Sequence, residues 1–204
     1  TRTNTYTYTD DLLDQIIKPG SNYTLYEYDE SNRVNRVSEK TSDDAEKAYI
    51  QYEYDNDDRI TRSFTSTLTE TIRTYVDGLL QTITDGEGRD TIFDYDEDDR
   101  LESVGDGTNT TAFAYDSEGR RIMVTSPSGI QTRYAYDSVT GNLETVYNNW
   151  SNGNELNYDT QYLYDLNDLG KNLVKVTDAE DRYIEYQYDA WDRLYREKIM
   201  DGAI

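Results

Sequence analysis

Cysteine and histidine are both absent from this chain of 204 residues. Without thiols it has no disulfides and no thiolate metal ligands. Cysteine usage therefore does not indicate whether the protein resides in an oxidising or a reducing compartment. Without imidazole it also lacks the commonest general base, which excludes Ser-His-Asp, Cys-His and typical zinc chemistry. A glycosidase needs one special pair of carboxylates, and among so many acids no pair stands out. We therefore expect that the protein is not an enzyme.

Long apolar runs are missing too. No stretch approaches the roughly 18 apolar residues of a membrane span, and no signal peptide opens the chain. Only 35% of the residues are hydrophobic, and 21 of them are tyrosine. We expect the tyrosine rings to supply most of the packing, because each buries an apolar body and keeps a hydroxyl for hydrogen bonding. The chain starts mid-pattern at Thr1, as a segment of a longer protein would.

The charge balance is strongly acidic, with 42 acidic against 20 basic residues and a net charge of -22. Such a chain repels polyanions, so we expect no nucleic acid partner and no membrane insertion. Cations are more compatible partners.

One motif recurs along the chain: an aromatic residue, any residue, tyrosine and then aspartate. Side chains alternate between the two faces of a strand, so both rings lie on one face and are buried or stacked there. We expect these rings to form a structural ladder. Its members are Tyr26 and Tyr28, Tyr52 and Tyr54, Phe93 and Tyr95, Phe113 and Tyr115, Tyr134 and Tyr136, Tyr162 and Tyr164, and Tyr186 and Tyr188. Degenerate copies surround Tyr8 and Tyr75.

Each motif is followed by a turn signal. A few polar residues, often including an arginine, precede an aliphatic residue and a second one about three positions on, as in Val34 and Val37. The residue before the arginine, or before its asparagine substitute, is of a type that tolerates positive φ, as a hairpin turn requires. These turn residues are Asn32, Asp58, Asp99, Gly119, Gly141 and Asp192. The motif aspartate can cap the turn through its carboxylate, and the arginine can cover a ring of a neighbouring repeat.

The spacing between motifs suits two short strands and two turns per repeat. An isolated hairpin is marginal in water, so each hairpin must lie beside the next. The sequence therefore predicts an all-β fold of tandem antiparallel hairpins in a long twisted or spiralled sheet. We expect residues 1–204 to form a single array of about eight hairpin units, a segment of a larger protein.

The strings Tyr136-Asp137-Ser138-Val139-Thr140-Gly141-Asn142-Leu143 and Tyr115-Asp116-Ser117-Glu118-Gly119-Arg120 resemble the consensus of the YD-repeat, or Rhs-repeat, family. The resemblance covers nearly the whole chain and is specific because of the number of copies. It implies the spiralled β-sheet shells of bacterial Rhs and Tc toxin proteins, teneurins and wall-associated proteins. In the toxins such a shell encloses a cargo domain.

Two kinds of modification or ligand site are conceivable. The acidic turns present Asp55, Asp57, Asp96 and Asp98, whose oxygens could hold Ca²⁺, although aspartate also simply suits tight turns. No other cofactor is expected. Sequons for glycosylation start at Asn22, Asn109 and Asn149, all in expected loops.

We expect a structural repeat module of a secreted or cell-surface assembly, such as a shell wall, stalk or fibre, which self-associates through open sheet edges. Its partners would be other copies or other parts of the same repeat protein. One alternative is an adhesin-type module that binds glycans or a surface protein through loop aromatics such as Trp150 and Trp191. Another is a fragment of a toxin-encapsulating Rhs-type shell.

Overall fold

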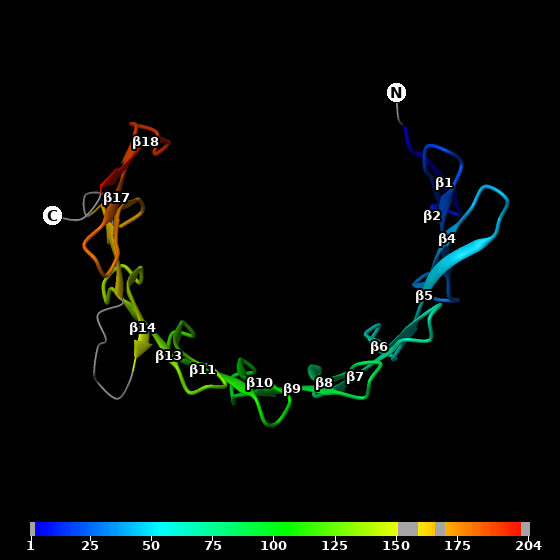
Figure 1. Ribbon diagram of the computed structural model, residues 1–204, viewed down its shortest axis with the longest axis horizontal. Helices are drawn as coiled ribbons and strands as arrows, with labels where there is room; N and C mark the ends of the chain where they lie inside the picture. Colours follow the sequence, from blue (N-terminus) through cyan, green and yellow to red (C-terminus); the bar gives the residue numbers. More distant parts are fainter. Residues whose placement is uncertain (1–2, 151–158, 166–169, 201–204) are drawn as a thin grey trace. The chain divides into compact units, whose positions relative to one another are not determined.

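The computed structural model describes residues 3–150, 159–165 and 170–200. Throughout that part the chain forms strands and turns, and no helix occurs in it. None of its segments is therefore a helix that could cross a membrane. The chain divides into two compact units, residues 1–94 and 95–204. Figure 1 labels the strands and colours them along the sequence. The prediction of an all-β fold of tandem antiparallel hairpins is confirmed.

The strands are short and follow one another closely. In the first unit they are β1 (Thr5–Thr9), β2 (Leu12–Ile17), β3 (Tyr23–Tyr28), β4 (Val34–Lys40), β5 (Glu46–Tyr54), β6 (Ile60–Thr65), β7 (Glu70–Val76), β8 (Leu79–Thr84) and β9 (Asp90–Tyr95), which ends at the boundary. In the second unit they are β10 (Leu101–Gly105), β11 (Thr110–Tyr115), β12 (Arg121–Thr125), β13 (Gln131–Tyr136), β14 (Leu143–Trp150), β15 (Asp159–Tyr164), β16 (Leu173–Thr177), β17 (Tyr183–Tyr188) and β18 (Leu194–Met200).

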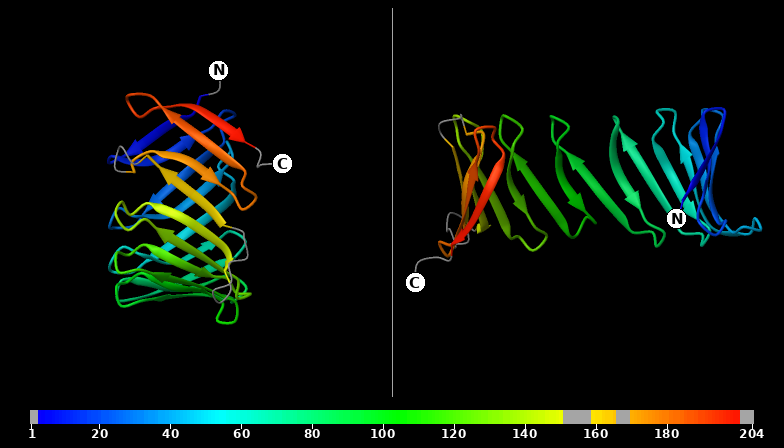
Figure 2. Two further views of the ribbon diagram at one scale, coloured as in Figure 1. Left: turned by 90° about the vertical axis from the view of Figure 1, so that its left-hand side faces the viewer. Right: turned by 90° about the horizontal axis from the view of Figure 1, so that it is seen from above.

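Within each unit, every strand pairs antiparallel with the next strand in the sequence. The strands of a unit therefore lie side by side in chain order (Figure 2). The connections are turns of a few residues, which is the arrangement that antiparallel pairing permits. Each unit has two rows of turns, one at either end of its strands. We call the turns that follow the paired aromatic residues the tyrosine-side turns, and the others the connecting turns.

Each unit is a single layer of sheet. In the described part, no hydrophobic side chain is fully buried, and the buried polar residues are Thr24, Ser38, Ser63 and Thr145. All fourteen aromatic residues of the expected ladder are half-buried. The residue between the two rings is exposed in most copies, as at Glu27 and Glu53. The alternation thus separates two faces as expected, but with one layer the rings are covered only by their neighbours along the sheet.

A β-bulge recurs at one place in eight hairpins, immediately before the second tyrosine. In the hairpin β3–β4, Tyr28 lies opposite Val34 and Tyr26 lies opposite Val37, and Asn35 is the extra residue. A bulge shifts the alternation by one residue, so two aliphatic residues three positions apart face the same side. The bulge therefore accounts for the aliphatic spacing of three. The tyrosines that follow these bulges are Tyr8, Tyr28, Tyr54, Tyr75, Tyr115, Tyr136, Tyr164 and Tyr188.

Candidate functional site

One turn structure is repeated with nearly the same hydrogen bonds. In the turn that starts at Asp55, Oδ1 accepts from the backbone N–H of Asp57 at 2.9 Å and of Arg59 at 3.0 Å. Oδ2 accepts from Nε of Arg59 at 2.8 Å. The carboxylate thus caps the turn and orients the arginine at once. The same three bonds are made in the turns that start at Asp29, Asp85, Asp96, Asp116, Asp178 and Asp189.

The turn residues named from the sequence all have positive φ. The values are 61° at Asn32, 62° at Asp58, 60° at Asp99, 79° at Gly119, 74° at Gly141 and 59° at Asp192. Aspartate and asparagine tolerate this region better than other residues with a side chain, and glycine enters it freely. Two connecting turns break this rule, because Ser21 has φ 67° and Leu68 has φ 60°.

The arginines also determine what the acidic turns can bind. Asp55 and Asp57 both contact Arg59, the latter through Nη2 at 2.9 Å. Asp96 and Asp98 contact Arg100 in the same way. The pKa of Asp55 is lowered, chiefly by the backbone N–H of Arg59 and further by its guanidinium, against a desolvation that raises it. These carboxylates, the calcium candidates, are thus bound to a cation of their own chain. In the described residues no group of three or more acidic side chains is placed to hold a metal ion.

The arginines of four tyrosine-side turns lie over a ring of the next hairpin. The ring is always that of the tyrosine after the bulge. The distances from the guanidinium carbon to the ring centre are 4.6 Å for Arg33 over Tyr54, 4.7 Å for Arg59 over Tyr75, 5.1 Å for Arg100 over Tyr115 and 4.7 Å for Arg120 over Tyr136. These distances are those of cation–π contacts. They link consecutive hairpins rather than residues of one hairpin.

The same tyrosines also bond to the preceding hairpin through their hydroxyls. Tyr54 Oη donates to the carbonyl of Val34 at 2.5 Å, and Val34 is the residue that follows Arg33. Burial raises the pKa of Tyr54, which keeps this hydroxyl protonated as a donor. A buried carbonyl beside a bulge needs such a partner. The other bonds of this kind run from Tyr28 to Leu13, from Tyr75 to Ile60, from Tyr115 to Leu101, from Tyr136 to Arg121 and from Tyr188 to Leu173.

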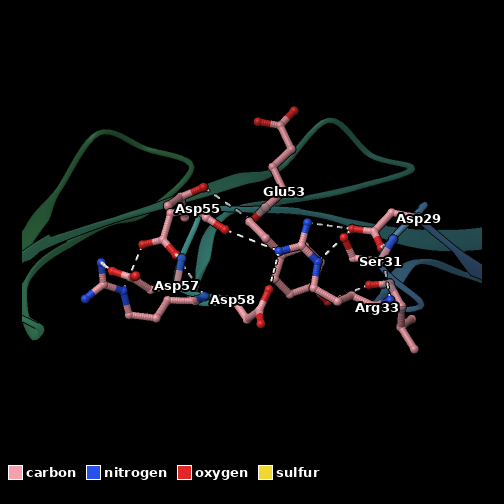
Figure 3. A network of polar contacts seen from close by, with 11 residues as sticks. Asp29, Ser31, Arg33, Glu53, Asp55, Asp57 and Asp58 are labelled. Carbon is pink, nitrogen blue, oxygen red and sulfur yellow. Dashed lines mark hydrogen bonds and ion pairs between the residues drawn. The ribbon is translucent and has the colours of Figure 1, made fainter.

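Together these contacts form what we call the inter-repeat joint: an arginine, the tyrosine ring of the next hairpin beneath it, and the hydroxyl bond from that ring to the carbonyl after the arginine. Figure 3 shows Arg33 between the turn of Asp29 and the turn that contains Asp55 and Asp58. The Arg33 guanidinium contacts Asp29 at 2.7 Å, Asp58 Oδ1 at 2.6 Å and the carbonyl of Asp55 at 3.2 Å. One side chain thus connects two turns and a ring.

The possible modification and contact sites lie apart from the joint. Asn22 lies in the loop between β2 and β3, and exposed Asn109, between β10 and β11, donates its side-chain amide to Asp106 at 3.1 Å. The loop expected at Asn149 is wrong, because this residue lies in β14 with φ 56°, where the register shifts against β13. Its short polar side chain permits that backbone as the extra residue of a bulge. Trp191 is 75% exposed in a tyrosine-side turn. The side chain of Trp150 lies outside the described residues.

Residues 164–198 match the RHS Repeat family, and they include most of β16 to β18 with the turns between them. The resemblance to RHS-repeat proteins is confirmed. A search of curated proteins gives no significant match to the chain.

Solved structures similar to this chain belong to much longer proteins. The crystal structure of TcdB2-TccC3-Cdc42 matches with a TM-score of 0.60 at 13% identity, over 94% of this chain and 12% of that chain. The crystal structure of TcdB2-TccC3 gives 0.60 at 13% identity, over 91% and 12%. The Photorhabdus luminescens Tc holotoxin pore with the mutation TccC3-D651A gives 0.61 at 14%, over 98% and 13%. At this identity the likeness shows the fold alone, and the chain spans about an eighth of each.

Proposed function

We propose that this chain is a structural repeat module, a section of wall in a larger secreted or cell-surface RHS-repeat protein of the toxin-shell kind. Its role is to extend a continuous single-layer sheet. The observation that carries the proposal is the inter-repeat joint, which recurs with the same atoms in four places. A structure whose recurring arginines and tyrosines join one hairpin to the next is suited to building a surface.

Two further observations support this proposal. The polar side chains that commonly supply chemistry in proteins are engaged here in turns: the capping carboxylates bind arginines, and the tyrosine hydroxyls bind backbone carbonyls. In addition, the fold matches a small section of much longer toxin chains. We infer that the chain works as one section among many and without catalysis.

The proposal is tested on the native protein that contains this chain. Antibodies against the folded chain are used to purify that protein from secreted and surface fractions of its source, and cryo-electron microscopy is then applied. We expect a sheet-walled particle in which strands flanking this chain continue its hairpin order. A particle in which the chain stands as an isolated domain on a linker would contradict the proposal.

A second candidate function is binding of a glycan or a surface protein, favoured by the exposure of Trp191. Its indole lies beneath the guanidinium of Arg193 at 5.0 Å, so a broad amphipathic surface projects from the turn. Exposed aromatic side chains of this kind are common in recognition surfaces. Binding on a glycan array that is lost in Trp191→Ala would support it, whereas equal binding by both proteins would remove its basis.

A further inference from the structure

One tyrosine-side turn lacks the arginine that the complete joints contain. In each of the four complete joints, the backbone N–H of the capping aspartate donates to the carbonyl of the arginine, as Asp116 does to Arg120 at 3.0 Å. In the turn between β13 and β14, the same bond runs from Asp137 to the carbonyl of Asn142 at 2.8 Å. Asn142 therefore occupies the arginine position. Its shorter side chain donates to the carbonyl of Gly170, in the next tyrosine-side turn, at 2.5 Å.

The carboxylate that would hold the missing guanidinium remains in place. In a complete joint, Oδ2 of the capping aspartate accepts from Nε of the arginine, as Asp116 does at 2.8 Å. Oδ1 of Asp137 accepts from the backbone N–H groups of Val139 and Thr140 and from the Thr140 hydroxyl, whereas Oδ2 has no hydrogen-bond partner in the described part of the chain. The bonds from Thr140 lower the pKa of Asp137. This half-buried carboxylate is therefore ionised at neutral pH and has no cation beside it.

The ring of the next hairpin is also unused. Tyr164 follows the bulge in the hairpin β15–β16 and lies opposite Leu173. This is the position that Tyr136 holds in its own hairpin, beneath Arg120 at 4.7 Å. Over residues 3–150, 159–165 and 170–200, no cation lies over the Tyr164 ring, and its hydroxyl makes no hydrogen bond. Burial raises the pKa of Tyr164, so the hydroxyl stays protonated.

A cavity of about 170 Å³ lies between these groups, lined among others by Asp137, Glu144, Tyr162 and Tyr164. One water takes about 30 Å³ and pockets for drug-sized molecules have about 300 to 1,000 Å³, so the cavity suits a small group. Glu144 is the extra residue of the bulge in β14, and its carboxylate forms no ion pair with any described residue. Two carboxylates and the negative face of an aromatic ring around a small space favour a cation.

The complete joints indicate which cation fits. In each of them a guanidinium bonds to the capping carboxylate and lies over the tyrosine ring. A guanidinium is planar, matches a carboxylate with parallel donors and stacks on a ring, whereas an ammonium is compact and strongly hydrated. The next joint has an asparagine too, but there Lys171 provides a cation that contacts Asp192. Gly141 holds the place of Lys171 in the turn of Asp137, so this turn supplies no cation of its own.

We propose that this cavity is a binding site for a guanidinium group from outside the chain, which bonds to Asp137 and lies over the ring of Tyr164. Free arginine and an arginine side chain of another protein are the two sources of such a group. The site goes beyond the proposed structural role, and that role does not depend on it.

Nuclear magnetic resonance titration of the purified chain with methylguanidinium chloride tests the proposal. The readout is the backbone N–H signals of Thr140 and Gly170, which line the cavity. We expect saturable shifts with a dissociation constant on the order of 1 to 10 mM, because so small a ligand makes few contacts. Methylammonium chloride and sodium chloride at the same concentrations should shift these signals much less. Equal shifts with all three salts, or no saturation with methylguanidinium, would overturn the proposal.

Three variants locate the binding. Asp137→Asn keeps Oδ1 as the turn acceptor and removes the charge, so the dissociation constant should rise about tenfold or more. Asp116→Asn is the matched control, because Arg120 already fills that site, and its binding should equal that of the unmodified chain. Asn142→Arg keeps the aspartate and adds a guanidinium to the turn, so the saturable shifts should disappear. Circular dichroism establishes that each variant is folded. An unchanged dissociation constant in folded Asp137→Asn or Asn142→Arg would contradict the proposal.

A second titration distinguishes the two sources of the guanidinium. Free arginine and arginine blocked at both ends, as acetyl-arginine amide, are compared under the same conditions, with acetyl-lysine amide as the control. Tighter binding of the blocked form indicates an arginine side chain of a protein, and tighter binding of the free form indicates the amino acid. If neither form binds better than acetyl-lysine amide, the cavity is not a guanidinium site, and the structural role of the chain would stand.

Discussion

The two rows of turns in each unit share one turn structure and use it differently. On the tyrosine side, Arg59 is 29% exposed and lies over a ring of the next hairpin. On the connecting side, Arg89 and Arg182 are 70% and 58% exposed, although Asp85 and Asp178 hold them with the same three bonds. The capped turn is therefore a local device that any hairpin can use. Only the tyrosine beneath the guanidinium converts it into a contact between repeats.

Sequence variation at the connecting side agrees with this view. Thr41 and Ser126 replace the capping aspartate there, and each hydroxyl oxygen accepts from a backbone N–H at 3.1 Å. Neither turn has an arginine at the fourth position after it. All four arginines of complete joints, in contrast, are bound by an aspartate. The four complete joints thus keep a charge pair that the connecting side can exchange for a hydroxyl.

The largest expected effect comes from acid, which acts on both rows together. The pKa of Asp55 is lowered chiefly by the backbone N–H of Arg59, and the pKa of Asp85 by the backbone N–H and then the side chain of Arg89. Backbone and side-chain donors lower the pKa of Asp106 to about 2. Because the pKa of these carboxylates is lower in the folded state, their ionised form stabilises the fold at pH values above the unfolded-state pKa of 3.8. This stabilisation is lost as the pH falls through the folded-state pKa.

We therefore expect the melting temperature to be level near neutrality and to fall steeply below about pH 4. Thermal melts followed by circular dichroism across this range measure it. Equal melting temperatures at about pH 6 and about pH 2 would show that the turn carboxylates contribute nothing.

Removal of a joint tyrosine is the next largest change. Tyr54→Ala deletes a ring under Arg33 and leaves the carbonyl of Val34 without its donor. We expect a loss of about 3 kcal/mol in the free energy of unfolding, from lost burial, the cation–π contact and the hydrogen bond together. Urea denaturation measures this loss. Tyr195→Ala is the control, because Tyr195 is 65% exposed on β18 and lies outside any complete joint, so its loss should stay within about 0.5 kcal/mol.

Removal of the arginine distinguishes the tyrosine-side turns from the connecting turns directly. Arg59→Ala and Arg182→Ala remove the same bonds to a capping aspartate, but only the first also uncovers a ring. We expect a fall of a few degrees in the melting temperature for Arg59→Ala and a much smaller one for Arg182→Ala, since an exposed ion pair is screened by solvent. Equal effects of the two variants would mean that the turn, and not the joint, accounts for the stabilisation.

The smallest effect concerns the connecting turn with Leu68, which is 83% exposed at φ 60°. A leucine in this backbone region is strained, and asparagine tolerates it. Leu68→Asn should therefore raise the free energy of unfolding by about 0.5 to 1 kcal/mol. Leu68→Ala removes the apolar side chain but keeps the strain, so it should give no such gain. If alanine stabilises as much as asparagine, exposed apolar surface and not φ is the cause.

The strands and their faces could be predicted because two rules act locally. Alternation of Tyr26 and Tyr28 with exposed Glu27 identifies a strand with one ring-bearing face, and Asn, Asp and Gly at a fixed offset identify the turn. The bulge was missed, although the sequence contains its signal. In a regular strand, Val34 and Val37 would lie on different faces of the sheet. Only an extra residue between them allows each valine to pair with a tyrosine of the neighbouring strand.

The joint could be predicted only in part. An arginine over a neighbouring ring follows from the residue types, and the structure gives it at Arg33 and Tyr54. The hydroxyl bond to Val34 could not be found, because it depends on the distance between hairpins and on a carbonyl whose position the bulge sets. Nor does composition reveal that the sheet has a single layer. A low aliphatic content fits a thin core, whereas among the described residues Thr24 and Ser38 are buried and no hydrophobic residue is.

The lack of a shared core has a consequence for how such a chain can change over generations. In a globular domain, deleting one strand opens a void that every other element lines. Here each described strand touches only those before and after it in the sequence, so a whole hairpin can be duplicated or lost while the remaining contacts stay intact. We therefore expect that insertion or deletion of a whole hairpin is tolerated. Insertion or deletion of a single strand should not be tolerated, because it would reverse the direction of every strand that follows.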